Sequence, residues 1–189
     1  MRYRMPRIPQ QPVPDRAGLD AGLTVELAAV VTGARRRALR DGDRQIDTAH
    51  LLHSLIESDP EVRAAFEGGS QLARVLGYLV QRSIGYGLRW QGSVEDSGAL
   101  PVVPRRDLAM RDAGVEGWSP SAAAAMSGAL GRAAARGDLR AGGLDLLAAL
   151  AVDHECRAVE VLARAGVDTE KLAARIADVR DQEVWGAEC

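Results

Sequence analysis

The stretch Thr24–Ile56, TVELAAVVTGARRRALRDGDRQIDTAHLLHSLI, decides the fold because the chain contains this pattern twice. Moved forward by 95 positions (119 − 24), it aligns without a gap with Ser119–Ala151, SPSAAAAMSGALGRAAARGDLRAGGLDLLAALA. The identical positions include Ala28 and Ala123, Gly33 and Gly128, Arg37 and Arg132, Gly42 and Gly137, Asp43 and Asp138, and Leu51 and Leu146. Because one small helical unit cannot bury its apolar face alone, we expect the copies to pack about a pseudo-two-fold axis. The seam between them is then the natural binding groove.

The first copy carries the signals that begin and end helices. Thr24 can cap the first helix, with Leu23 before it as a hydrophobic staple, and Gly42 supplies the left-handed residue that ends it. The spacing predicts four helices: Thr24 to Gly42, Asp47 or Thr48 to Asp59-Pro60, a short helix through Phe66, and a helix after Gly68-Gly69-Ser70. The second copy opens with Trp118-Ser119-Pro120 and repeats these signals. We therefore expect an all-α fold of two four-helix repeats.

The segment between the copies has no helical period and is punctuated by glycine and proline. The chain then divides into residues 1–22, a proline-rich basic tail expected to be disordered; 23–85, the first repeat; 86–117, a linker; 118–184, the second repeat; and 185–189, a C-terminal tail.

Composition excludes several classes of protein. The net charge is −2, which gives no reason to expect a nucleic-acid partner. Two cysteines do not make a disulfide framework, and they favour a reducing compartment. No apolar run approaches the roughly 20 residues of a membrane span, and the first residues do not form a signal peptide. We therefore expect a cytoplasmic protein with no membrane association and no cofactor.

Catalytic signals are missing. Lys171 is the only lysine, and no glycine loop precedes it, so the chain has no phosphate-binding P-loop. His50, His53 and Glu57 share one side of a helix, but a metal site needs further ligands from a second element. Cys156 is expected in the core. We expect neither an enzyme nor a metal protein.

The motifs of both copies resemble the Clp repeat, which opens with an aromatic-Thr pair and carries an Ile-Gly-Thr-Glu-His-Leu-Leu signature. The first copy has Leu23-Thr24, Arg40-Asp41-Gly42 and Ile46-Asp47-Thr48-Ala49-His50-Leu51-Leu52. The second has Trp118-Ser119-Pro120, Arg136-Gly137-Asp138 and Gly142-Gly143-Leu144-Asp145-Leu146-Leu147. The resemblance covers Leu23–Ile84 and Trp118–Val179. It indicates the N-terminal domain of ClpA- and ClpC-type unfoldases, here as a free-standing double repeat without the ATPase module.

The resemblance implies two four-helix units that bind adaptor proteins and substrates. In the ClpC branch, a threonine at each repeat start and a glutamate in each Thr-Glu-His motif bind phosphorylated arginine. Thr24 and Ser119 keep a hydroxyl, but Ala49 and Leu144 occupy the glutamate positions. A guanidinium ligand would lose charge-assisted hydrogen bonds worth about 1.5–3 kcal/mol each. We therefore expect phosphoarginine to bind far more weakly than to a glutamate-bearing domain.

The sequence thus predicts a non-catalytic module that binds a protein or peptide. The residues expected at the groove are Leu23, Thr24, Ala49, Trp118, Ser119 and Leu144, with Asp47 and Asp145 as replacement acidic residues. The expected partners are Clp adaptors, Clp subunits, substrates or small cyclic peptides that target the unfoldase domain. The protein would be a monomer or weak dimer. The alternative is a self-associating structural or regulatory helical protein with no Clp-linked role.

Overall fold

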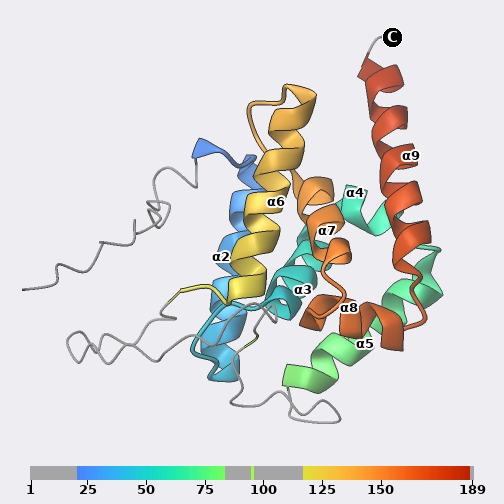
Figure 1. Ribbon diagram of the computed structural model, residues 1–189. Helices are drawn as coiled ribbons and strands as arrows, with labels where there is room; N and C mark the ends of the chain where they lie inside the picture. The colour runs from blue at the N-terminus through green and yellow to red at the C-terminus, as the bar shows by residue number, and fades with distance from the viewer. Residues whose placement is uncertain (1–20, 84–94, 96–116, 188–189) are drawn as a thin grey trace, which may run out of the picture.

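The computed structural model describes residues 21–83, 95 and 117–187, which form helices and two isolated bridges (Figure 1). The first repeat contains α2 (Val25–Asp41), α3 (Thr48–Ser58), α4 (Pro60–Ala64) and α5 (Gly69–Ser83). The second repeat contains α6 (Pro120–Arg136), α7 (Gly143–Val152), α8 (Arg157–Arg164) and α9 (Thr169–Ala187). The predicted all-α fold of two four-helix repeats is confirmed.

The predicted ends of the first helix of each repeat are also confirmed. The Thr24 hydroxyl accepts a hydrogen bond from the Leu27 amide at 3.2 Å, and the Ser119 hydroxyl accepts one from the Ala122 amide at 3.1 Å. Each of these bonds satisfies one amide that the helix itself leaves without a partner. At the other ends, Gly42 and Gly137 adopt left-handed φ angles of 74° and 83°.

Backbone hydrogen bonds between the repeats are reciprocal. The amide of Thr24 donates to the carbonyl of Ala141 at 3.0 Å, and the amide of Ser119 donates to the carbonyl of Ile46 at 2.8 Å. A shift of 95 residues converts each bond into the other (24 to 119, 46 to 141). The bonds from Ala141 to Gly22 and from Ile46 to Gly117 form a second reciprocal pair. Such exchange defines a pseudo-two-fold axis at the boundary.

Helix packing follows the same symmetry. Helix α3 packs against α8, as α7 packs against α4, so each repeat inserts its second helix between helices of the other. A Cβ atom at Gly33 would lie 3.2 Å from the Ser54 hydroxyl, and one at Gly128 would lie 3.3 Å from the Ala149 Cβ. The first two helices of each repeat therefore approach closely at equivalent glycines.

The repeats differ in their second halves, because α8 is longer than α4. Beyond this point the shift between equivalent elements is 100 residues: α5 begins at Gly69 and α9 at Thr169. Arginines nevertheless make matching links across the molecule. Arg74 Nε donates to the Ala165 carbonyl, and Arg175 Nε donates to the Ala65 carbonyl, both at 3.0 Å. The pseudo-symmetry thus survives the change in length.

One apolar core runs through both repeats. Its largest fully enclosed side chains are Leu27, Ile46, Leu51, Leu52, Leu55, Ile56, Leu79, Met126, Leu146, Leu147, Leu150 and Leu162. Because these come from both copies, neither repeat has a core of its own. None of the described helices combines the length and apolar character needed to cross a bilayer.

Two predicted boundaries can be compared with the structure. Helix α9 continues to Ala187, beyond the predicted end of the second repeat at residue 184. At the other end, the predicted tail 1–22 includes Gly22, whose carbonyl accepts the Ala141 amide at 2.9 Å. Residues 1–20 of that tail and nearly all of the predicted linker 86–117 lie outside the described residues.

The interface between α2 and α3 holds a neutral histidine. Arg37 donates to His53 Nδ1 at 3.3 Å, and His53 Nε2 lies 3.1 Å from a carboxylate oxygen of Glu57, so the proton is on Nε2. Burial, and then the Arg37 charge, lower the pKa of His53 from 6.5 to about 4.

Acidification should therefore destabilise the fold. Between pH 6.5 and about 4, the unfolded chain takes up a proton at His53 that the folded protein does not. We expect this site to lower the free energy of unfolding by about 1–2 kcal/mol across that window, less than the full shift because water screens the site. Urea unfolding of the wild type and of His53→Gln at both ends of the window measures it. An equal loss of stability in the two proteins would contradict the assignment.

Candidate ligand site at the boundary between the repeats

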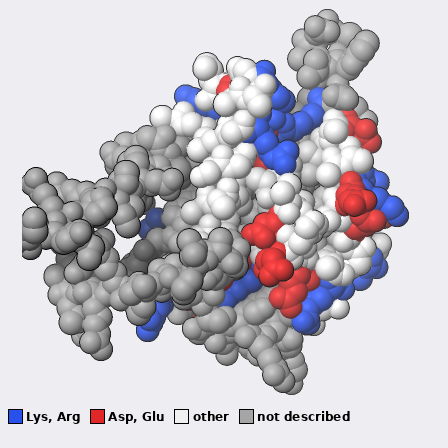
Figure 2. All heavy atoms as spheres, viewed as in Figure 1, with Lys and Arg blue, Asp and Glu red and all other residues white. Residues whose placement is uncertain are grey.

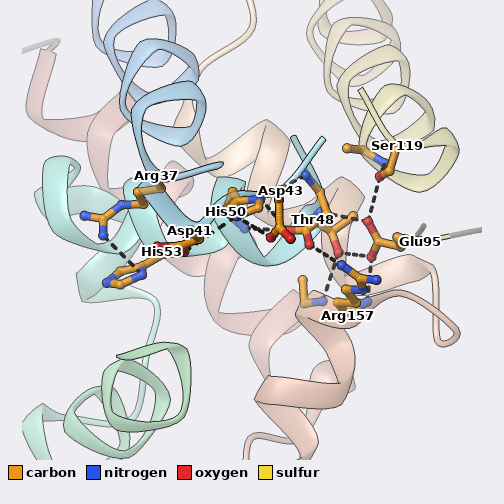
Figure 3. Close-up of polar contacts among 12 residues, drawn as sticks. Arg37, Asp41, Asp43, Thr48, His50, His53, Glu95, Ser119 and Arg157 are labelled. Atoms are coloured by element: carbon orange, nitrogen blue, oxygen red, sulfur yellow. Dashed lines mark hydrogen bonds and ion pairs between the residues drawn. The ribbon is translucent and has the colours of Figure 1, made fainter. Parts of the chain in front are cut away.

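The carboxylate of Glu95 lies where the two repeats meet (Figure 3). One of its oxygens accepts the amide of Thr48 at 2.9 Å and the hydroxyl of Ser119 at 2.7 Å. The other oxygen accepts the amide of Arg157 at 2.7 Å and the hydroxyl of Thr48. Glu95 is only 5% exposed. A residue from the predicted linker is therefore held by donors from both repeats.

The donors suit an anion because of their positions on helices. Thr48 and Arg157 are the first residues of α3 and α8, where amides have no partner within the helix and the positive end of the helix dipole lies. No side chain caps α8 at Cys156, so Glu95 supplies the missing acceptor. Two helix N-termini thus converge on one carboxylate.

A buried ion pair extends this network. Arg157 donates to Asp47 at 2.6 Å, and the hydroxyl of Thr48 accepts the amide of Ala158 at 3.0 Å. Asp47 also caps α3 by accepting the amide of His50 at 2.9 Å, while His50 Nδ1 accepts the Asp47 amide in return. These bonds connect the two repeats through buried polar groups. Removing one member would leave the others unsatisfied.

The pseudo-symmetry places a second carboxylate at the equivalent corner. By the 95-residue shift, Thr48 corresponds to Gly143, and the start of α8 at Arg157 corresponds to the start of α4 at Pro60. The carboxylate of Asp59 accepts the Val62 amide at 3.2 Å, and a Cβ atom at Gly143 would collide with its other oxygen. Each corner therefore contains an acidic side chain: Asp59 from within the first repeat, and Glu95 from between the repeats.

Most of the residues predicted for the groove are buried in the structure. Leu23, Ala49, Ser119 and Leu144 are each at most 3% exposed, so they are packing or capping residues and do not form an open floor. They are enclosed because each repeat covers the start of the other. Thr24 and Trp118 are partly exposed at this boundary. Ligand binding at the six residues stays a prediction, with these two as the accessible members.

Asp47 and Asp145, the predicted replacement acids, are also buried. Asp47 is bonded to Arg157, and Asp145 to Arg136 and Arg180. Both carboxylates are thus held by intramolecular partners. A further carboxylate at the boundary belongs to Glu95, which sequence analysis missed. Its segment has no periodicity, and no motif distinguishes it from neighbouring acidic residues.

A pocket of about 220 Å³ opens beside this site, between α6 and α7. Thr48, Ser121 and Cys156 contribute to its walls, and small residues such as Ala125 and Ala149 form much of the rest. The Ser121 hydroxyl is buried and makes no hydrogen bond with the part of the chain that the structure describes. Burial raises the pKa of the Cys156 thiol to about 11, so it is a neutral wall residue. The pocket can accept a small apolar side chain.

Asp43, Asp47 and His50 bring three potential metal-ligand atoms within 4.8 Å of one another. However, Asp47 is already bonded to the guanidinium of Arg157, and His50 Nε2 lies 3.2 Å from Asp43. A cation would have to compete with that guanidinium charge. We therefore describe this group as an ion-pair cluster.

The solved structures that share this fold include two with low sequence identity. One comes from preliminary structural investigations of a malarial protein secretion system, with a TM-score of 0.59 and 12% identity over 83% of this chain and 93% of that chain. The other is the N-terminal domain of the caseinolytic protease associated chaperone ClpD from Arabidopsis thaliana, with a TM-score of 0.54 and 16% identity over the same shares. No protein-family model and no curated protein matches the sequence. The chain therefore has the Clp N-terminal-like fold that its repeat motifs predicted.

Replacing Glu95 should loosen the boundary. In Glu95→Gln, one carboxylate oxygen becomes an NH₂ group that faces hydrogen-bond donors, so at least one buried donor loses its acceptor. We expect the free energy of unfolding to fall by about 1–3 kcal/mol. The exposed Glu67→Gln is the control for the charge change alone. Urea unfolding measures the stability, and faster amide hydrogen exchange at Thr48 and Arg157 would locate the loss. Equal stability of the two variants would contradict this role.

Proposed function

We propose that the protein is a non-catalytic module that binds a protein or peptide partner at the boundary between its two repeats. One observation carries the proposal: the boundary already binds an acidic side chain that belongs to neither repeat. Within the described part of the chain, the donors to Glu95 come from Thr48, Ser119 and Arg157. An acidic residue of a partner offers the same carboxylate to the same donors.

The neighbouring surface indicates what the partner would carry next to that acid. Thr48 belongs both to the Glu95 network and to the 220 Å³ pocket, so the two sites share a wall. The pocket has mostly small apolar walls, with the hydroxyls of Thr48 and Ser121 and the charged residues Arg132 and Asp153 as its polar members. A peptide with an acidic residue followed or preceded by a small apolar or hydroxyl side chain fits this pair of sites.

The fold supports a partner of the Clp system. Domains of this fold occur on the ClpD chaperone, and the repeat motifs resemble those that bind adaptors and substrates. We propose Clp adaptors, substrates or Clp-targeting cyclic peptides as the partners, with Thr24 and Trp118 contacting them from the boundary surface. Glu95 acts as a tethered competitor. Because Glu95 is part of the same chain, its effective concentration at these donors is about millimolar. A partner must therefore bind tightly enough to displace the Glu95 carboxylate.

A labelled peptide tests the proposal. The probe is the protein's own segment of residues 91–99, QGSVEDSGA, added to wild type and to Glu95→Ala. We expect binding at least about tenfold tighter to Glu95→Ala, because the tethered carboxylate no longer competes. The same peptide with glutamine at the position of Glu95 should bind neither protein. Fluorescence anisotropy measures the affinities.

Matched controls make the result decisive. Glu67→Ala should behave as wild type, since Glu67 is exposed and remote from the network. In Glu95→Ala, the peptide should restore hydrogen-exchange protection at the Thr48 and Arg157 amides. Equal affinity for all three proteins, or binding that does not protect these amides, would refute a peptide site at this boundary.

A further inference from the structure

A second pocket, of about 260 Å³, lies between α6, α7 and α9 of the second repeat. Three arginines contribute to it: Arg132 and Arg136 from α6, and Arg180 from α9. Figure 2 shows basic side chains gathered between α6 and α9, beside uncharged surface. The rest of the lining is mainly small or apolar: Ala148, Ala151, Val152, Ala173, Ile176 and Ala177. The pocket therefore combines a cationic side with an apolar side.

Comparison of the two repeats explains why this pocket exists. In the first repeat, Arg37 is bonded to His53, Ser54 and Glu57. The 95-residue shift replaces Arg37 by Arg132, and its three partners by Ala148, Ala149 and Val152. The second repeat therefore keeps the arginine but has smaller, apolar side chains where the first repeat has the arginine's polar partners. Among the described residues, the Arg132 side chain makes no hydrogen bond or ion pair.

The other two arginines converge on one buried carboxylate. Arg136 and Arg180 approach the same oxygen of Asp145 at 2.8 and 2.5 Å. Burial alone would raise the pKa of Asp145, but hydrogen bonds from Arg136, the Gly142 amide and Arg180 lower it below its ordinary value. Asp145 therefore stays ionised and shares its charge between two guanidiniums.

Positive charge remains after these pairs are counted. Asp138, outside the pocket, also pairs with Arg136 at 2.9 Å, so three arginines face two carboxylates. In addition, Arg180 Nε is buried and has no hydrogen-bond partner among the described residues. A buried donor without an acceptor costs about 1–3 kcal/mol. An anion near Arg132 and Arg180 would supply both the missing charge and an acceptor.

We propose that this pocket binds an oxyanion carried on a short apolar stem, either a phosphate monoester or a carboxylate. The guanidiniums of Arg132 and Arg180 hold the oxyanion, and Ala148, Val152 and Ile176 contact the stem. The described residues of the first repeat, 21–83, form no such site. Arg136 and Asp145 correspond there to Asp41 and His50, so the equivalent position holds an acidic side chain in place of an arginine, and Arg37 is already paired.

The Glu95 network shares no residue with this pocket, although the 220 Å³ pocket beside that network shares Arg132 and Val152 with it. The probes are phenyl phosphate, benzoate, inorganic phosphate and the uncharged control phenol, titrated into the full chain by calorimetry. Phenyl phosphate or benzoate should bind, and whichever binds more tightly identifies the oxyanion. Inorganic phosphate should bind more weakly than phenyl phosphate because it lacks the stem, and phenol should not bind measurably.

Arginine variants locate the site. Arg132→Gln should weaken binding by about fivefold or more while leaving the unfolding midpoint unchanged, since this side chain bonds to none of the residues that the structure describes. Arg36→Gln, an exposed arginine of α2, is the matched control and should bind as wild type. Nitrogen-15 spectra should show the Arg180 Nε signal move on titration.

Three results would overturn the proposal: no binding of either organic anion, equal affinity for phenol, or equal affinity of the Arg132→Gln and Arg36→Gln variants. Glu95→Ala should bind the anion as wild type does. A failure at the repeat boundary and a failure at this pocket are therefore distinguishable.

Discussion

The exchange of backbone hydrogen bonds at the repeat boundary organises the whole molecule. Thr24 donates to Ala141, and Ser119 donates to Ile46. Each bond joins the residue that caps the first helix of one repeat to the strand-like residue before the second helix of the other. The register of these two short pairings therefore fixes where all four helices begin relative to one another. Once it is fixed, α3 and α7 must enter the opposite repeat and share one core.

This arrangement also creates an electrostatic requirement. The pairings bring the first turns of α3 and α8 together at one corner, and the corresponding turns of α7 and α4 at the other. Helix starts present amides without partners and positive dipole ends, which are costly to bury unless an acceptor is present. Asp59 supplies an acceptor to the first turn of α4 from within its own repeat, and Glu95 supplies acceptors to α3 and α8 from outside both repeats. The candidate binding site is thus a consequence of the fold's symmetry.

The sequence predicted most of the fold because its signals are local. Caps at Thr24 and Ser119, and left-handed glycines at positions 42 and 137, depend on residues within one turn. The duplication then predicted that the two copies pack about a pseudo-two-fold axis. The site could not be predicted in the same way. Glu95 acts over 47 residues to Thr48 and 62 to Arg157, and no local pattern marks such a contact. The burial of Ala49 and Leu144 likewise depends on how the other repeat covers them.

Duplication followed by divergence explains the difference between the two halves. Both copies need the close approach at Gly33 and Gly128, so that part of the helix pair is preserved. The charged residues around this close approach need only an opposite charge or water as a partner. In the first repeat Arg37 is enclosed by polar partners that stabilise the α2–α3 pair. In the second repeat the equivalent partners are alanine and valine, and apolar packing holds α6 against α7 without them. Arg132 has thus lost the structural role that Arg37 keeps, and the smaller neighbouring side chains leave a pocket beside it. A charged side chain next to such a pocket can bind a ligand.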